Sequence, residues 1–263
     1  MAKFAMMVAT GALVACSSPQ EMGDTLGTAA PESSVSPIEL AKPRVVSVEN
    51  EQMKFSFSWP SEAVAIPALN AVFEARAKAE QDKFSAMTAE ARADAKEYGY
   101  PYRAYDFSKG WEVAASTPRF ISLAAGTYAY TGGAHGNSWF DSMMWDREAG
   151  VEMAQTDLFS SLDALGAAVR EPYCTGLRAE QTERIGGEAT NGTDIFDGCP
   201  ALEELVVVFE SSSGEAFDTI NLLAAPYVAG SYVEGSYEVK VPVTQAVIDA
   251  VKPEFRSAFS LGN

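Results

Sequence analysis

Apolar and polar residues alternate over the segment 45–59. Phe55, Phe57 and Trp59 occupy every second position, with polar residues between them. This period is typical of a strand that buries one face and leaves the other in water. The pattern therefore predicts a strand over 45–59 that ends before Pro60.

The next segment has the period of a helix. Its apolar residues recur at the spacing of one helical face: Leu69, Phe73, Ala77, Phe84, Met87, Ala91 and Tyr98. Pro67 suits the first turn of a helix, and Gly99 and Pro101 end the pattern. We expect one long amphipathic helix over 67–97, with its charged residues on a solvated face.

The rest of the chain mixes both patterns. We expect further strands at 102–107, 111–116, 119–130, 138–146, 205–209, 217–223 and 237–241. We expect several shorter helices at 157–184, 244–251 and 253–259. The continuous apolar run 205–209 is typical of a central strand. Because strands and helices do not alternate strictly, we predict an α+β fold with a mostly antiparallel sheet.

The first residues have the composition of a secretory signal. Lys3 precedes an apolar run over 4–14 that is too short for a spanning helix. The end of this run, Leu13–Cys16, is similar to the lipobox of bacterial lipoproteins, in which the cysteine is acylated and the chain is cut before it. We expect lipidation at Cys16; an ordinary signal peptide with a coincidental cysteine is the alternative.

These features divide the chain into parts with different roles. The expected parts are a signal peptide at 1–15, a lipidated disordered tether at 16–43, and an extracytoplasmic domain at 44–263 with possible sub-parts at 44–150 and 151–263. Ser17 follows the cysteine, and by resemblance to sorted lipoproteins this favours the outer membrane. We therefore expect a lipid-anchored protein of the cell envelope that faces the periplasm.

The composition of the chain limits the classes of function that we expect. The chain of 263 residues has 36 acidic and 19 basic side chains, and its net charge is −17. This balance disfavours nucleic acid as a partner and is compatible with a cationic one. A single histidine and three cysteines leave few side chains for metal or nucleophilic catalysis. We expect no cofactor and no metal site, and binding rather than catalysis.

The cysteines have separate expected roles. Once Cys16 is assigned to lipid, Cys174 and Cys199 remain as an even pair in an oxidising compartment. We expect a disulfide between them, with two free thiols as the alternative.

The strongest local feature is the sequence Tyr-Thr-Gly-Gly-Ala-His-Gly-Asn at 130–137. Its glycines allow a tight turn or a close approach of the backbone to another group. One interpretation is a binding loop in which His135 donates a hydrogen bond and pairs with Asp141; the other is a structural connection between two strands. The candidate binding residues are Tyr130, Gly132, Gly133, His135, Asn137 and Asp141.

Further aromatic residues also allow two interpretations. One group is compatible with a sugar-binding platform or with core packing: Tyr128, Tyr130, Trp139 and Trp145. A second group fits a flexible lip or a turn before a strand: Gly230, Tyr232, Gly235 and Tyr237.

The sequence at 130–136 resembles the hallmark of a bacterial extracytoplasmic domain. That domain occurs in RsiV-type lysozyme-sensing anti-sigma factors and in the non-catalytic N-terminal part of PdaC-type peptidoglycan deacetylases. Other similar blocks are Asp146–Gly150, Asp157–Phe159, Pro226–Gly230 and Val239–Pro242, so that the resemblance covers about residues 44–260. The resemblance implies an envelope-facing recognition domain.

The chain departs from both relatives. It shows neither an inner-membrane helix with a cytoplasmic sigma-binding segment nor a deacetylase domain with its metal ligands. We therefore carry over neither signalling nor deacetylation. We expect a non-catalytic domain that binds a cell-wall-related partner such as lysozyme or peptidoglycan. The alternative is a carboxylate-dependent hydrolase of cell-wall glycan that uses the region of the glycine-rich loop.

Overall fold

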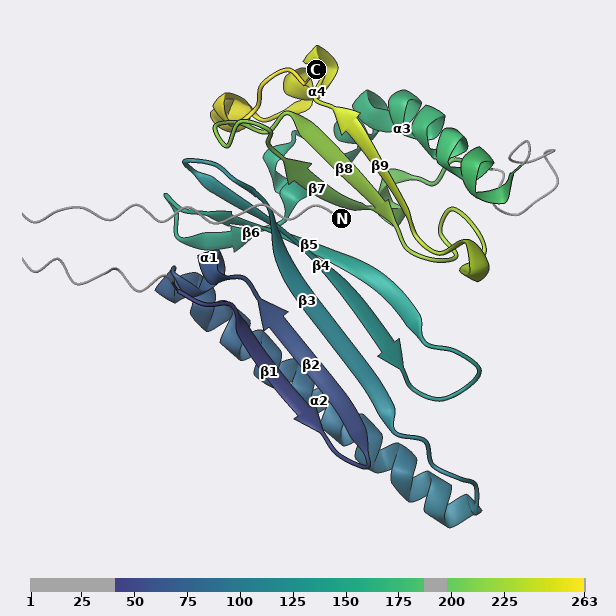
Figure 1. The fold of residues 1–263 in the computed structure, drawn as a ribbon. Helices are drawn as coiled ribbons and strands as arrows, with labels where there is room; N and C mark the ends of the chain where they lie inside the picture. Colours follow the sequence, from purple (N-terminus) through teal and green to yellow (C-terminus); the bar gives the residue numbers. More distant parts are fainter. Residues whose placement is uncertain (1–40, 187–197, 263) are drawn as a thin grey trace, which may run out of the picture. The chain divides into compact units, whose positions relative to one another are not determined.

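The computed structural model describes residues 41–186 and 198–262, which belong to one compact unit, Leu40–Asn263 (Figure 1). The strands are β1 (Arg44–Glu49), β2 (Met53–Trp59), β3 (Tyr105–Ser116), β4 (Phe120–Tyr130), β5 (Asn137–Asp146), β6 (Val151–Met153), β7 (Val206–Glu210), β8 (Thr219–Ala224) and β9 (Tyr237–Pro242). The α-helices are α1 (Ser61–Val64), α2 (Pro67–Tyr98), α3 (Leu162–Ile185) and α4 (Gln245–Ala250). Short 3₁₀ helices are η1 (Gln155–Leu158), η2 (Leu202–Glu204), η3 (Tyr232–Glu234) and η4 (Pro253–Ala258). The predicted α+β class, with mostly antiparallel sheets and one long helix, is confirmed.

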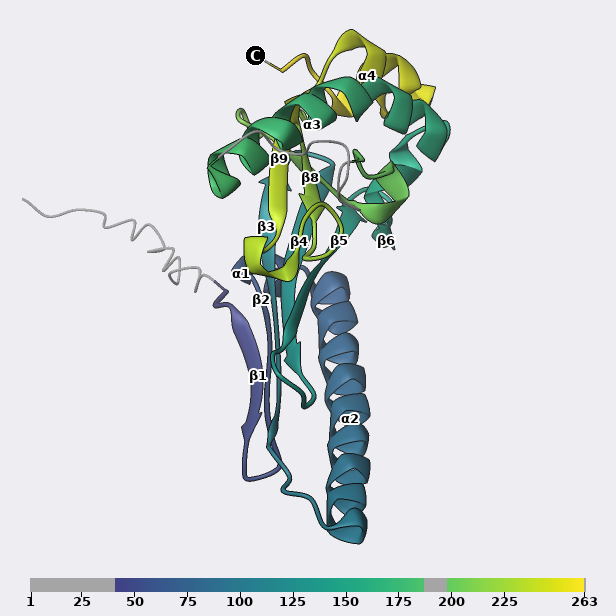
Figure 2. The ribbon, with the colours of Figure 1, turned by 90° about the vertical axis from the view of Figure 1, so that its right-hand side faces the viewer.

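The first sheet has the order β1-β2-β3-β4-β5-β6. Its neighbours are antiparallel except β2 and β3, which run parallel and are connected through α2. Helix α2 lies along one face of this sheet (Figure 2). Its Phe73 ring lies 6.0 Å from the ring of Trp59 and 5.4 Å from that of Trp111, measured between centroids. These buried aromatic side chains form the core between helix and sheet.

The second sheet has the order β7-β8-β9 and is antiparallel throughout. Helix α3 packs on β9 (Figure 1). Strand β7 contacts β3, β4 and β5 of the first sheet. The core of this part therefore also includes Phe120 and Met144 from the first sheet.

Two strand predictions are wrong in their boundaries. The segment 45–59 forms a hairpin, because the Asn50 side-chain oxygen accepts hydrogen bonds from the backbone N–H groups of Gln52 and Met53 and turns the chain. The expected strands 102–107 and 111–116 are one strand, β3, which begins only at Tyr105 and continues through Gly110. The predicted helix 67–97 agrees with α2, which ends at Gly99 in a left-handed conformation.

Two further predictions need correction. The expected helix 157–184 begins later, because Ser161 caps α3 by accepting a hydrogen bond from the N–H of Ala164. The strand expected at 205–209 is not central, since β7 lies at the edge of its sheet. It is nevertheless buried, because the first sheet covers it.

Candidate functional site

The glycine-rich segment connects β4 to β5. Gly132 and Gly133 have φ angles of 98° and 84°, in the region that glycine adopts without strain. Gly136 lies against the ring of Tyr128, and a β-carbon at this position would lie 2.4 Å from the Tyr128 hydroxyl oxygen. The backbone conformation and the close approach to Tyr128 therefore explain why glycines occur here. Any interaction with a partner would depend on the side chains that this loop presents.

His135 presents its ring to a second loop. Its Nδ1 lies 2.8 Å from the carbonyl oxygen of Gly136, which orients the imidazole. The ring stacks on Tyr232, with centroids 3.8 Å apart and planes inclined by 23°. Tyr232 in turn stacks on Tyr227, with centroids 5.7 Å apart. The structure thus brings together two sequence blocks that the resemblance identified separately.

The second loop, residues 225–236, connects β8 to β9. Tyr227 has a φ angle of 73° and is the one non-glycine residue with a positive φ in the described part of the chain. Its N–H donates to the carbonyl of Gly230 at 3.0 Å, and its side chain is 52% exposed. Such a conformation is costly for a bulky residue and persists where surrounding contacts impose it. The loop therefore holds an exposed tyrosine in a strained but defined position.

Helix α3 contacts the same loop at several other residues. The Gln181 side-chain amide donates to the carbonyl of Ala229 at 2.7 Å. The Arg184 guanidinium donates to the carbonyls of Glu234 and Ser236 at 2.9 and 2.6 Å. It also lies 4.1 Å from the centroid of the Tyr237 ring. Because α3 holds the loop at several points, the structure favours a held turn over a flexible lip.

The Glu234 carboxylate is the acceptor at the centre of the loop. It accepts hydrogen bonds from the N–H and hydroxyl of Ser231 at 2.8 and 2.7 Å and from the Tyr237 hydroxyl at 2.6 Å. Burial alone would raise the pKa of Glu234, but these hydrogen bonds and the charge of Arg184 outweigh it and lower that pKa. Burial, together with the hydrogen bond to Glu234, raises the pKa of Tyr237 to about 12.

We expect the contribution of Glu234 to stability to disappear in acid. A carboxyl whose pKa is lower in the folded state than its ordinary value of 4.5 stabilises the fold above that value. The contribution is then lost as the pH falls through the lowered pKa. Urea unfolding of the wild type and of Glu234→Gln, from neutral pH to below 4.5, should show their difference in free energy of unfolding shrinking in acid. A difference that stays constant over this range would contradict the assignment.

The sequence-predicted site residues do not converge on one point. His135 faces Tyr232, whereas Tyr130, Gly132 and Gly133 line a separate pocket. Asn137 and Asp141 line a groove between α2 and strands β3–β5. Of the two interpretations of the glycine-rich loop, the one that pairs Asp141 with His135 does not agree with the described contacts, in which Lys109 in β3 binds Asp141 at 2.7 Å.

The pocket beside the glycines is rich in tyrosine. It has a volume of about 340 Å³, and its aromatic lining residues are Tyr100, Tyr102, Tyr105 and Tyr130. Burial and the neighbouring tyrosines raise the pKa of Tyr105. Sequence reasoning missed Tyr100, Tyr102 and Tyr105 as site residues. The one available signal was the density of tyrosine after Gly99, at positions 100, 102 and 105.

The proposed sugar platform is not a single surface. Trp145 is 3% exposed and belongs to the core under α2. Trp139 lines the groove between α2 and the sheet, whereas Tyr128 is 37% exposed and covers Gly136. Core packing is therefore the role of Trp145, and the other aromatic side chains lie in different places.

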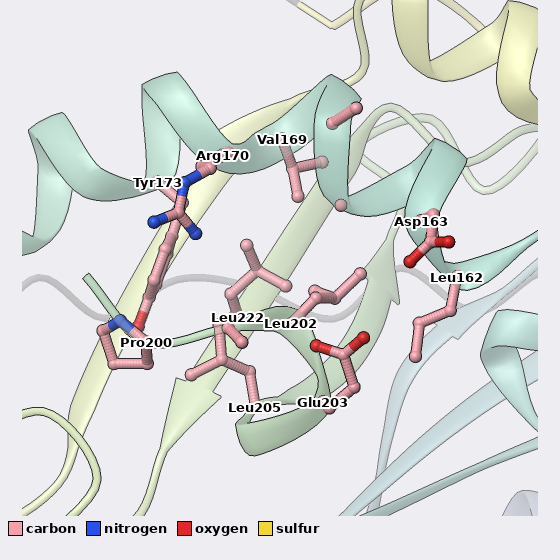
Figure 3. A pocket seen from close by; sticks show the side chains of 13 residues that line it. Leu162, Asp163, Val169, Arg170, Tyr173, Pro200, Leu202, Glu203, Leu205 and Leu222 are labelled. Atoms are coloured by element: carbon pink, nitrogen blue, oxygen red, sulfur yellow. The ribbon is translucent and has the colours of Figure 1, made fainter. Parts of the chain in front are cut away.

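A further pocket of about 190 Å³ lies between α3 and η2 (Figure 3). Four leucines are among its lining residues, and Asp163 and Glu203 also line it. The Tyr173 hydroxyl is buried there and has no hydrogen-bond partner within 41–186 and 198–262, and burial raises the pKa of Tyr173. The pocket contains none of the sequence-predicted binding residues, so it does not enter the candidate site.

The predicted disulfide between Cys174 and Cys199 is present. Cys16, the signal peptide at 1–15 and nearly all of the tether at 16–43 lie outside the described residues. Within residues 41–186 and 198–262, no group of three or more histidine, cysteine or acidic side chains is placed to hold a metal ion. In the same residues, no helix combines the length and the apolar character needed to cross a membrane.

Comparison with known proteins shows similarity in sequence to a family model and similarity in structure to solved proteins. Residues 46–138 match the family model described as Deacetylase PdaC, which is less than half of the chain. No curated protein matches the sequence. A DUF3298 family protein from Pseudomonas aeruginosa PAO1 has a similar structure, with a TM-score of 0.54 and 15% identity over 85% of this chain and 98% of that one. A DUF3298 family member from Bacteroides fragilis gives a TM-score of 0.53 and 15% identity over 85% of this chain and 94% of that one. The chain therefore has the fold of DUF3298 family proteins, with a first part that is similar to the PdaC family model.

Proposed function

We propose that this chain is a non-catalytic, lipid-anchored domain of the bacterial cell envelope that binds lysozyme. The observation that carries the proposal is the stack of His135, Tyr232 and Tyr227, which joins the two loops into one surface. Beside it, Val233 is 92% exposed. Rigid aromatic side chains with an exposed apolar neighbour are typical of the residues that dominate protein–protein binding energy.

Charge supports a cationic protein as the partner. The chain carries a net charge of −17, and hen-type lysozymes are strongly cationic. Opposite charges of this size accelerate encounter and make association sensitive to salt. Lysozyme also agrees with the resemblance to RsiV-type sensors described above. A hydrolase that uses Asp141 beside His135 is not proposed, because Asp141 is bound to Lys109 instead.

The experiment is a titration of the purified full chain with a hen-type lysozyme at low and physiological salt. We expect tight binding that weakens as salt increases. Tyr232→Ala should weaken binding about tenfold or more, because it removes the centre of the stack. Tyr98→Ala is the matched control: Tyr98 is 73% exposed at the end of α2, and its loss should leave binding unchanged. Lysozyme binding that is absent, or equal in the two variants, would contradict the proposal.

The tyrosine pocket favours peptidoglycan as a second candidate ligand. Sugar rings stack on aromatic side chains, and Tyr100 lines the pocket while 51% exposed. Titration with purified peptidoglycan fragments tests this candidate, and Tyr100→Ala should weaken that binding without affecting lysozyme. Fragment binding that is unchanged in Tyr100→Ala would exclude the pocket as the glycan site.

A further inference from the structure

A cleft of about 700 Å³ lies between the two sheets. One wall is formed by β3 and β4 on the face opposite α2, where Gly110 and Glu112 alternate with the buried core residue Trp111. The other wall is formed by β7, β8 and β9 on the face opposite α3. On β9, Glu238 and Lys240 line the cleft, whereas Val239 between them points to α3.

Small residues and two end contacts keep this cleft open. Gly110 of β3 is paired with Gly126 of β4, and a β-carbon at Gly126 would meet no atom of the described residues within 4 Å. At one end the sheets meet through aromatic residues such as Phe120 and Phe217, whose ring centroids lie 6.2 Å apart. At the other end the loops meet through the stacked rings of His135 and Tyr232.

A hydrogen-bonded acidic cluster covers the wall formed by the second sheet. The Asn221 side-chain N–H₂ group donates to the carboxylates of Glu210, at 3.0 Å, and of Glu238. Lys240 binds the other oxygen of Glu210 at 2.8 Å. For Glu238 and Glu112, no basic partner is found within the described ranges. The charged lining is therefore three glutamates against one lysine, an excess of negative charge.

Asn221 points to a missing donor in this cleft. The residue is 5% exposed and lines the cleft from the central strand β8, yet its Oδ1 has no hydrogen-bond partner among the residues that the structure describes. Rotating the amide by half a turn would aim this oxygen at the carboxylates of Glu210 and Glu238, so the observed orientation is the favourable one. A buried acceptor without a donor is costly, and a ligand that donates to it would remove the cost.

We propose that the cleft binds a ligand that carries an ammonium or guanidinium group on an apolar stem. These groups donate hydrogen bonds and accept none, which suits Asn221 Oδ1 and the carboxylates of Glu112 and Glu238, for which the described residues supply no basic partner. The apolar stem would lie against Phe140, Leu223 and Val208, which also line the cleft. The same chemistry is offered by a free amine and by a lysine or arginine side chain of a bound protein.

Hexylamine is the probe, and hexanol is its neutral counterpart of the same length. Isothermal titration of the full chain should show saturable binding of hexylamine and much weaker binding of hexanol. In NMR spectra, hexylamine should shift the side-chain amide of Asn221 and the backbone amides of Gly110 and Gly126. Equal binding of both compounds, or an Asn221 amide that does not move, would overturn the proposal.

Three variants locate the binding. Gly126→Val fills open space in the cleft and should abolish hexylamine binding. Glu238→Gln should weaken it about tenfold, because it removes a charge-assisted hydrogen bond. Glu90→Gln removes one negative charge at an exposed position of α2 and should have no effect. If Gly126→Val does not fold, comparing the hexylamine affinities of Glu238→Gln and Glu90→Gln still tests the proposal. Equal weakening of binding in these two variants would overturn it.

Competition with lysozyme distinguishes the two sources. If hexylamine displaces lysozyme and Gly126→Val weakens lysozyme binding, the cleft takes a basic side chain of the partner. If hexylamine binds without affecting lysozyme, the cleft takes a free amine. The proposal does not rest on lysozyme binding: a chain that ignores lysozyme but binds hexylamine as described contradicts the proposed function and supports the amine site.

Discussion

Replacing both Cys174 and Cys199 by serine lowers the free energy of unfolding by about 3 kcal/mol. The bond links positions 25 residues apart, between α3 and the segment before η2. In the unfolded chain it restricts the many conformations that these residues would otherwise adopt, so its loss favours the unfolded state. A domain of ordinary stability, about 5–15 kcal/mol, loses a substantial share. Urea denaturation of the double variant and the wild type at neutral pH measures the difference.

The wild-type chain under strong reductant is the matched control. It lacks the same bond but keeps both sulfur atoms, so its unfolding midpoint should fall close to that of the double variant. The loss of stability should appear as unfolding at a lower urea concentration. The dependence of the free energy of unfolding on urea should also become slightly steeper, since the unfolded chain without the disulfide exposes more surface. A loss below about 1 kcal/mol would show that the bond contributes little beyond the packing of α3.

The long helix, the first hairpin and strand β7 differ in how far they could be predicted from the sequence. Helix α2 is predictable because Leu69, Phe73 and Ala77 repeat with its period and all become buried. The hairpin of β1 and β2 is not predictable in this way. Its turn depends on backbone N–H groups that donate to the side-chain oxygen of Asn50, within a segment whose pattern predicts one strand. Strand β7 shows the limit of hydrophobicity as a signal: the run 205–209 is apolar because another sheet covers it, although the strand lies at the edge of its own sheet.

The candidate site could be predicted only in part, because only some of its residues stand out in the local sequence. The glycines and His135 stand out in the sequence as an unusual local composition. The stacking partner of His135 does not, because Tyr232 lies in a different loop, and only the packing of one sheet on the other brings the two rings together. The cleft between the sheets is still less visible. Its residues come from β3, β4, β5, β7, β8 and β9, and no local pattern indicates that Glu112 and Glu238 face the same space.

The glycines of α3 give the second large effect. Gly176 packs against Val239 of β9, and a β-carbon at this position would lie 2.5 Å from a methyl carbon of that valine. Val239 is 5% exposed and β-branched, so it has little freedom to move aside. Overpacking of this kind costs about 1–3 kcal/mol, whereas glycine to alanine in a helix favours folding by about 1 kcal/mol. Gly176→Ala should therefore lower the free energy of unfolding by up to about 2 kcal/mol.

Gly166→Ala is the matched control in the same helix. Its β-carbon would lie 3.7 Å from the Leu202 side chain, an ordinary contact, so this variant should gain about 1 kcal/mol from helix propensity alone. Urea denaturation of both variants should thus give changes of opposite sign. Because Gln181 and Arg184 on α3 hold the loop that carries Tyr227 and Tyr232, Gly176→Ala should also weaken partner binding, and Gly166→Ala should not. Equal stabilisation by both substitutions would show that the spacing of α3 and β9 adapts, and that the loop does not depend on this close approach.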